Sequence, residues 1–236
     1  MAEPTTSNRA TPNLTTPNLT TTSYAILGLL ALRPWTTYEL AQQMTRALGQ
    51  FWPRAESNLY AEPKKLVALG MATASSETVG RRSRTLYAIT AEGRRALETW
   101  MATRPEATAP VLEFEALVRV FFAEHGSKDD LVAAIEGVRT WAEELFARSV
   151  DIPRQYLRGD GPFPERLPWL ILTGTFITEH TLTIGRWAEW AAGVVEAWPE
   201  DVSGAPADWA ALEHMADQCD DYVRRAAARR RNDGTG

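Results

Sequence analysis

The stretch SNLYAEPKKLVALGMATASSETVGRRSRTLYAIT, residues 57–90, decides the fold. Its first part places Leu59, Leu66 and Leu69 as apolar anchors of a helix, and Gly70 stands where such a helix ends. Beyond Gly70 the pattern changes to two short runs of strand type, MATASSETV and RTLYAIT, around a tight turn at residues 80–83. The stretch therefore predicts a helix followed by a two-stranded hairpin.

The residues on both sides of this stretch complete a known arrangement. Upstream, SYAILGLLAL is apolar enough for a buried helix that Pro34 ends, and Thr36 and Glu39 stand at capping-box spacing before a second helix. Downstream, Thr90 is expected to cap a fourth helix that reaches Trp100. Three helices, a hairpin and a helix in about 85 residues predict a winged helix-turn-helix. In that fold the third helix enters the major groove of DNA and the hairpin, the wing, lies against the phosphates.

Cationic and polar side chains occur where this motif would meet DNA. Guanidinium groups bind phosphate oxygens through charge-assisted hydrogen bonds, which suits the arginines of the hairpin turn. Polar groups of the third helix are expected to reach phosphates and base edges. The alternatives are a solvated loop for the arginines, a solvated helix face for the lysines and a core position for the helix tyrosine. The predicted DNA-binding residues are Thr37, Tyr38, Arg54, Ser57, Asn58, Tyr60, Lys64, Lys65, Arg81, Arg82 and Arg84.

Charge divides the chain into two parts. Residues 20–104 carry 11 basic and 6 acidic side chains, a balance of +5, whereas residues 105–236 carry 13 basic and 23 acidic ones, a balance of −10. This division is typical of a polyanion-binding module joined to a partner or regulatory module. The predicted domains are a disordered leader at 1–21 containing the repeat TPNLT, a winged helix-turn-helix at 22–104, a helical dimerisation domain at 105–230 that could also bind an effector, and a disordered tail at 231–236.

Several motifs follow one another between Tyr24 and Trp100: YAILGLLAL, TTYEL, FWPRAESNLYAEPKKLVALGMA and GRRSRTLYAITAEGRRALETW. In this order they resemble the PadR family of transcriptional regulators, and LEFEALVRVFFAEHG at 112–126 is similar to the start of that family's helical C-terminal region. The resemblance implies a dimeric, ligand-responsive repressor. The expected fold is mainly α, with an N-terminal winged helix-turn-helix and a two-stranded wing, followed by an all-helical C-terminal dimerisation domain.

The third helix departs from the family pattern. The commoner pattern has proline directly after the helix tyrosine, whereas here Ala61 follows Tyr60 and Pro63 comes later. A proline inside a helix removes one backbone hydrogen bond and clashes with the preceding turn, at a cost of about 3 kcal/mol. Either the helix kinks at Pro63, or its regular part begins close to that residue.

The C-terminal half is predicted to be helical throughout. Apolar residues at 128–152 alternate spacings of four and three, as in a coiled-coil seam, a long apolar helix is expected at about 168–198, and a last helix carries an apolar stripe from Trp209 to Val223. The seam could pack within one subunit, but a dimer would span two half-sites of an inverted-repeat operator. The predicted dimer-interface residues are Leu131, Ile135, Val138, Leu145, Trp209 and Leu212.

One stripe of the long helix combines aromatic rings with polar groups. It consists of Phe176, His180, Thr183, Trp187 and Trp190. Such a stripe suits either a well-filled helical core or an effector site for a planar aromatic compound. Both interpretations are kept.

Other function classes lack their characteristic residues. The single Cys219 leaves no disulfide framework or multi-cysteine metal cluster, and the three histidines are scattered, so no metal, cofactor or catalysis is expected. The start has no signal-peptide pattern and the apolar run at 169–177 is shorter than the roughly 20 residues of a bilayer span, so a cytoplasmic protein without membrane contact is expected. The expected function is sequence-specific DNA binding by a dimeric repressor. The alternative is a winged-helix adaptor that binds proteins and not DNA.

Overall fold

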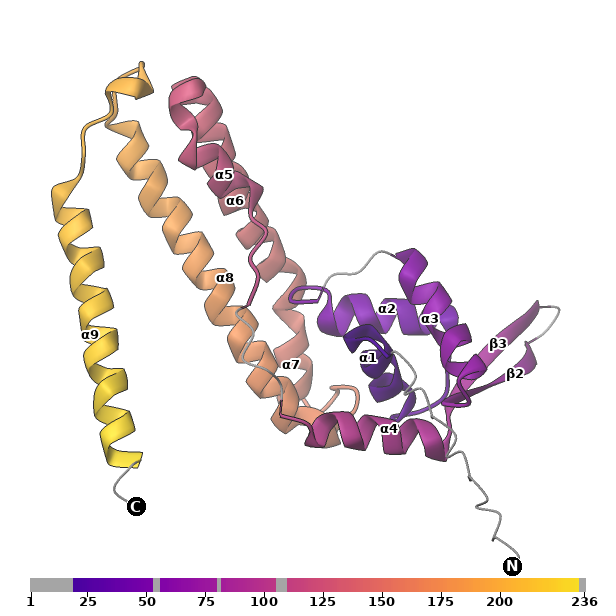
Figure 1. The fold of residues 1–236 in the computed structure, drawn as a ribbon. Helices are drawn as coiled ribbons and strands as arrows, with labels where there is room; N and C mark the ends of the chain where they lie inside the picture. Colours follow the sequence, from indigo (N-terminus) through magenta and orange to yellow (C-terminus); the bar gives the residue numbers. More distant parts are fainter. Residues whose placement is uncertain (1–18, 53–55, 80–81, 105–109, 234–236) are drawn as a thin grey trace, which may run out of the picture. The chain divides into compact units, whose positions relative to one another are not determined.

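The computed structural model describes residues 19–52, 56–79, 82–104 and 110–233 (Figure 1). The chain divides into two compact units, an N-terminal unit at 1–110 and a C-terminal unit at 111–236. The described chain is mainly helical and has one small antiparallel sheet, in the N-terminal unit. The predicted fold class is therefore confirmed. None of the described helices is both long and apolar enough to cross a membrane.

The N-terminal unit has the predicted order of elements. They are α1 (Thr21–Leu30), β1 (Trp35–Thr36), α2 (Thr37–Leu48), α3 (Glu56–Ala68), β2 (Ala72–Val79), β3 (Arg82–Ile89) and α4 (Ala91–Ala102). The hairpin of β2 and β3 pairs Ala72 with Ile89 and Val79 with Arg82. The two-residue strand β1 adds to the other edge of β3, where Trp35 stands opposite Tyr87. The wing thus belongs to a three-stranded sheet, one strand more than expected.

Local hydrogen bonds determine where the helices of this unit begin. Thr36 and Glu39 form the predicted capping box at the start of α2, and Thr20 and Ser23 form a second one at the start of α1. Thr90 caps α4, as expected, because its Oγ1 accepts a hydrogen bond from the Gly93 backbone N–H at 3.1 Å. Such caps satisfy backbone N–H groups that have no partner within the helix.

The proline of the third helix lies within a continuous helical segment. α3 begins at Glu56, so the alternative in which its regular part starts near Pro63 is wrong. Pro63 is buried together with Leu59 and Leu66. These side chains turn one face of α3 toward the core and leave the opposite face of the helix to solvent.

The C-terminal unit is helical throughout its described residues. Its elements are α5 (Glu115–Phe121), the 3-10 turn η1 (Ala123–His125), α6 (Lys128–Ser149), α7 (Asp151–Leu157), η2 (Pro164–Arg166), α8 (Leu167–Glu196), η3 (Val202–Gly204) and α9 (Trp209–Asp233). The predicted helix at 128–152 ends at Ser149 and α7 follows directly. α9 continues to Asp233, through three residues that were expected to belong to the tail.

The core of the C-terminal unit lies between α6 and α8, which run side by side (Figure 1). Leu131, Ile135 and Val138 of α6 are at most 4% exposed and pack with small and branched residues of α8, Ala188, Ala191 and Val195. These three α6 residues were predicted to form a dimer interface, whereas the structure buries them within one chain. Apolar residues at this spacing form a stripe along α6 that must be covered from water. The side chains of α8 in the same chain cover it.

Candidate nucleic-acid interface

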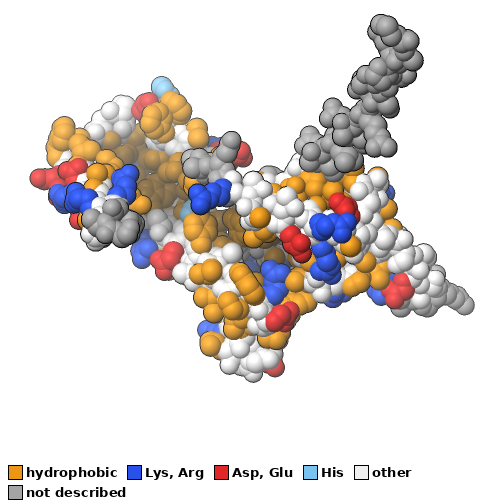
Figure 2. Space-filling model, turned by 60° about the horizontal axis from the view of Figure 1, so that its bottom comes forward, with side chains coloured by type: hydrophobic (Ala, Val, Ile, Leu, Met, Phe, Trp, Pro, Cys, Tyr) orange, Lys and Arg blue, Asp and Glu red, His pale blue; other side chains and the backbone are white. Residues whose placement is uncertain are grey.

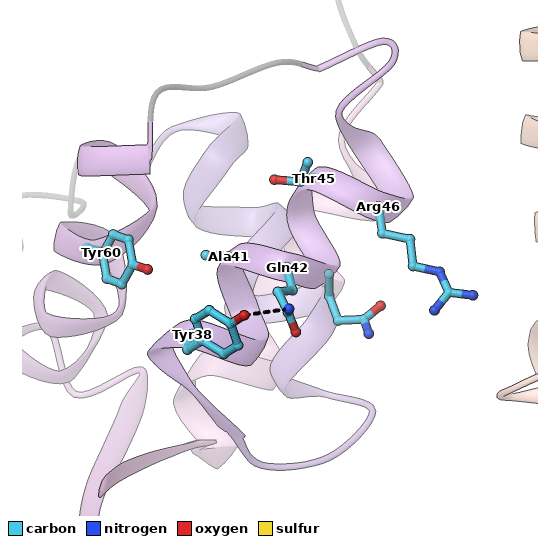
Figure 3. Close-up of a pocket in the computed structure, with 7 residues that line it drawn as sticks. Tyr38, Ala41, Gln42, Thr45, Arg46 and Tyr60 are labelled. Carbon is cyan, nitrogen blue, oxygen red and sulfur yellow. Dashed lines mark hydrogen bonds between the residues drawn. The ribbon is translucent and has the colours of Figure 1, made fainter. Parts of the chain in front are cut away.

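An open hollow of about 480 Å³ lies between the outer faces of α2 and α3 (Figure 3). Its lining is mostly polar and aromatic: Tyr38, Ala41, Gln42, Gln43, Thr45, Arg46 and Tyr60. Tyr38 and Tyr60 are 63% and 40% exposed, whereas tyrosine side chains are on average more buried than this. Hydroxyl, amide and guanidinium groups on one helix pair are the groups that hydrogen-bond phosphates and base edges.

The α2 helix brings three of these side chains into one row. Tyr38, Gln42 and Arg46 are four residues apart, so they share a face of the helix. The Gln42 side-chain amide donates a hydrogen bond to the Tyr38 hydroxyl at 2.9 Å, and Arg46 points away from both tyrosines (Figure 3). Gln42 and Arg46 were not among the predicted DNA-binding residues, although they stand four and eight residues after the predicted Tyr38 on the same helix. Thr37, which was predicted, is half-buried at the first position of α2.

Glu39 stabilises the N-terminus of α2 without facing the hollow. Its carboxylate accepts hydrogen bonds from the Thr36 backbone N–H and hydroxyl, each at 2.8 Å, and Arg33 lies 3.4 Å away. The Thr36 N–H is the main cause that lowers the pKa of Glu39 below its ordinary value, and the Thr36 hydroxyl and Arg33 act in the same direction against partial burial. Glu39 is thus held ionised at the positive end of the helix dipole.

The α3 helix contributes one exposed lysine and one paired lysine. Lys64 is exposed, whereas the ammonium of Lys65 lies 3.0 Å from Glu62 and 3.4 Å from the Ser23 hydroxyl. The backbone of Ser57 and Asn58 is helical, but their side chains, like the whole of Arg54, lie outside the described residues. The expected DNA contacts of those three residues stay predictions.

The wing carries a cross-strand ion pair. Arg84 stands opposite Glu77 in the hairpin, with its Nη2 2.7 Å and its Nε 2.9 Å from a Glu77 carboxylate oxygen. The charge of Arg84 is thus partly balanced within the protein. Arg82 begins β3 but its side chain is not described, and Arg81 lies outside the described residues.

The predicted effector stripe of α8 is divided between core and surface. Trp187 is half-buried and meets Phe114 edge to face, with ring centroids 6.1 Å apart. Phe176 is 59% exposed and stacks on the exposed His180 at 5.9 Å. Trp190 is 54% exposed, and the Thr183 hydroxyl donates to the Glu179 carbonyl oxygen of its own helix. In the part of the chain that the structure describes, no group of His, Cys, Asp and Glu side chains could hold a metal ion.

Three helices, a hairpin and an open polar face on α2 and α3 define a winged helix-turn-helix protein of the DNA-binding class. Residues 26–99 match the family model described as the transcriptional regulator PadR-like family. This match covers residues 26–99, so the winged-helix part of the chain is similar to the PadR-like family. The members of this family are transcriptional regulators and not enzymes.

One curated protein and two solved structures are similar to this chain. The negative transcriptional regulator PadR of Bacillus subtilis (strain 168) is 30% identical over 100 residues, which are 42% of this chain and 54% of that protein. The chain thus matches about half the length of this curated relative. A crystal structure of Bacillus subtilis PadR in complex with operator DNA has a TM-score of 0.61 at 22% identity, with 73% of this chain and 98% of that chain covered. The smu.1604c protein of Streptococcus mutans UA159 gives 0.62 at 22% identity, with 71% and 96% covered. These two structures share the fold.

Proposed function

We propose that this protein is a sequence-specific DNA-binding transcriptional regulator that acts as a dimeric repressor in the cytoplasm. The exposed polar face of α2 and α3 in a PadR-like winged helix carries the proposal. The curated relative is described as a negative regulator, and Bacillus subtilis PadR has been crystallised with operator DNA. The competing function, a protein-binding adaptor, would leave the exposed Lys64 and Arg46 without a phosphate to bind.

The direct test is binding to the DNA upstream of the protein's own gene. Fluorescence anisotropy with this duplex and a shuffled duplex should give tighter binding to the former, and an adaptor would bind neither. Replacing Arg81, Arg82 and Arg84 together by alanine should weaken binding to both duplexes and flatten the salt dependence, because wing contacts go to phosphates. Replacing Asn58 by alanine should instead change the preference among operator variants by about 1–3 kcal/mol at one base pair. Arg148→Ala, at an exposed ion pair of α6, is the matched control.

Dimerisation is proposed to use α9 and the half-buried Leu145 of α6. None of the described α9 side chains is buried, and its exposed apolar side chains include the predicted interface residues Trp209 and Leu212, at 73% and 49% exposure. Figure 2 shows that hydrophobic side chains are exposed among charged and polar ones.

The charges of α9 favour an antiparallel pair of two copies. The acidic side chains from Glu213 to Asp221 precede the basic ones from Arg224 to Arg231 along this helix. An antiparallel pair sets each acidic half against the partner's basic half, whereas a parallel pair would set like charges together. A two-fold pair also suits an operator with half-sites about 10 base pairs apart, or a multiple of that.

Sedimentation tests this interface. Leu212→Asp combined with Trp209→Asp should yield a folded monomer with weakened operator binding, because two carboxylates then lie in the apolar contact. Leu157→Asp, at an 88% exposed apolar residue of α7, is the matched control and should stay dimeric. A double variant that keeps the mass of a dimer would contradict the use of α9.

The effector is proposed to be a planar aromatic acid that stacks on the exposed rings of α8. Bacillus subtilis PadR has been crystallised with p-coumaric acid, a compound of this kind, and that structure has a TM-score of 0.53 at 24% identity. The Phe176 and His180 stack offers flat faces, and the exposed Trp190 offers another one further along α8. p-Coumaric acid should release the protein from its operator in the anisotropy assay, and Phe176→Ala with Trp190→Ala should abolish this response. Release that persists in this double variant would place the effector elsewhere.

A further inference from the structure

An acidic side chain of the third helix faces the protein and not the solvent. The Glu62 side chain is 14% exposed, and its Oε1 accepts hydrogen bonds from the Ser23 hydroxyl and from the Lys65 ammonium, the latter at 3.0 Å. The Lys65 ammonium also reaches the Ser23 Oγ at 3.4 Å, and Ser23 is fully buried. The three side chains thus form one network between α1 and α3.

The network is anchored at the N-terminus of α1. Ser23 belongs to the capping box of that helix, because its Oγ accepts the Thr20 backbone N–H at 2.9 Å while its own N–H is bound by Thr20. The Glu62 carboxylate therefore lies at the positive end of the α1 dipole and has two donors. This arrangement holds both Glu62 and the Lys65 ammonium on the side of α3 that meets α1.

The neighbouring lysine has a different environment. Lys64 is exposed, and it shares the outer face of α3 with Tyr60, four residues earlier, which lines the hollow. Among the described residues, Lys65 forms an ion pair and Lys64 forms none. Two adjacent lysines of the same helix therefore differ in the charge that they can offer to DNA.

We propose that Glu62 masks Lys65 from DNA, so that Lys64 makes a phosphate contact and Lys65 makes none. This proposal rests on the proposed DNA-binding function. An ammonium that keeps its carboxylate partner releases no counterion from DNA, and an ionised Glu62 repels phosphates near Lys65. Glu62 is thereby a positioning residue, which fastens α3 to α1 and lowers the affinity for DNA of any sequence. Sequence-independent binding competes with the operator, so the mask favours specificity.

The test measures the salt dependence of binding to a shuffled duplex for the full-length protein. Each phosphate contact contributes about 0.9 to the slope of log K against log salt, or about 3.5-fold in affinity between 50 and 200 mM. Lys64→Gln should lower the slope by this amount and Lys65→Gln should leave it unchanged. Glu62→Gln should raise it by the same amount, because the glutamine carbonyl still accepts from Ser23 while Lys65 loses its counter-charge. The double variant Glu62→Gln with Lys65→Gln should return to the wild-type slope.

A solely structural role for Glu62 would change stability but not the number of phosphates neutralised. Equal losses of slope in Lys64→Gln and Lys65→Gln would overturn the mask, and this comparison stands where Glu62→Gln fails to fold. An unchanged slope in a folded Glu62→Gln protein would overturn it as well. A wild-type protein that binds neither duplex would refute the proposed function and the mask together, whereas binding with the wrong slopes would refute the mask alone.

Discussion

Lys128 joins the beginning of α6 to the end of α8, and its replacement by methionine should destabilise the C-terminal unit. Its ammonium donates to the carbonyl oxygens of Trp198 at 2.7 Å and Glu196 at 3.0 Å, and its side chain is 16% exposed. Carbonyl groups at the end of a helix have no partner within it. Hydrogen bonds from a charged donor contribute about 1.5–3 kcal/mol each, and ordering a lysine side chain costs about 2 kcal/mol. The expected loss in free energy of unfolding is therefore about 1–4 kcal/mol.

Thermal and urea unfolding at a fixed protein concentration measure this loss. At about 4 °C per kcal/mol, the transition of the C-terminal unit should fall by about 4–16 °C. Glu200→Gln is the control, because Glu200 lies 3.9 Å from the same ammonium but is 92% exposed, and an exposed ion pair contributes little. An unchanged Tm in Lys128→Met would refute the reasoning. A loss as large in Glu200→Gln would show that the ion pair, and not the helix end, is the source.

Three further outcomes are expected. Gly93→Ala should destabilise the N-terminal unit by about 1–3 kcal/mol in thermal unfolding, since a Cβ there would overlap the Met71 carbonyl oxygen, and an unchanged Tm would contradict this close packing. Ile135→Ala should cost the C-terminal unit about 2–5 kcal/mol in urea while sedimentation still gives the wild-type mass, because this side chain is 1% exposed within one chain. Ionised Glu39 should contribute stability that is fully present above its unfolded pKa and is lost as pH falls through its lowered folded pKa. The difference in free energy of unfolding between wild type and Glu39→Gln should therefore shrink from about pH 6 to about pH 3. A difference that stays constant over this range would count against the cap.

The sequence alone predicted most of the N-terminal unit because its signals are local. Capping boxes such as that of Thr36 and Glu39 join residues three apart, and the change of period after Gly70 marks the hairpin within a few residues. The third strand β1 was missed, since two residues are too short for a pattern, and their strand conformation comes from pairing with β3. The spacing of Gln42 and Arg46 from Tyr38 shows that they share its face of α2, but only the structure shows that this face is hollowed.

The tertiary structure decided which charges and which apolar stripes have partners. Glu62 and Lys65 stand three residues apart, a spacing at which helix side chains can pair, but the contact of Glu62 with Ser23, 39 residues away in the chain, could not be read from any local pattern. The stripe of Ile135 and Val138 was recognised as apolar, but only the packing against α8 showed what covers it. The period of a helix or a strand is a property of residues that are neighbours in the chain, so the sequence shows it directly. Partners across the fold depend on how distant elements pack, and that arrangement minimises the free energy of the whole chain.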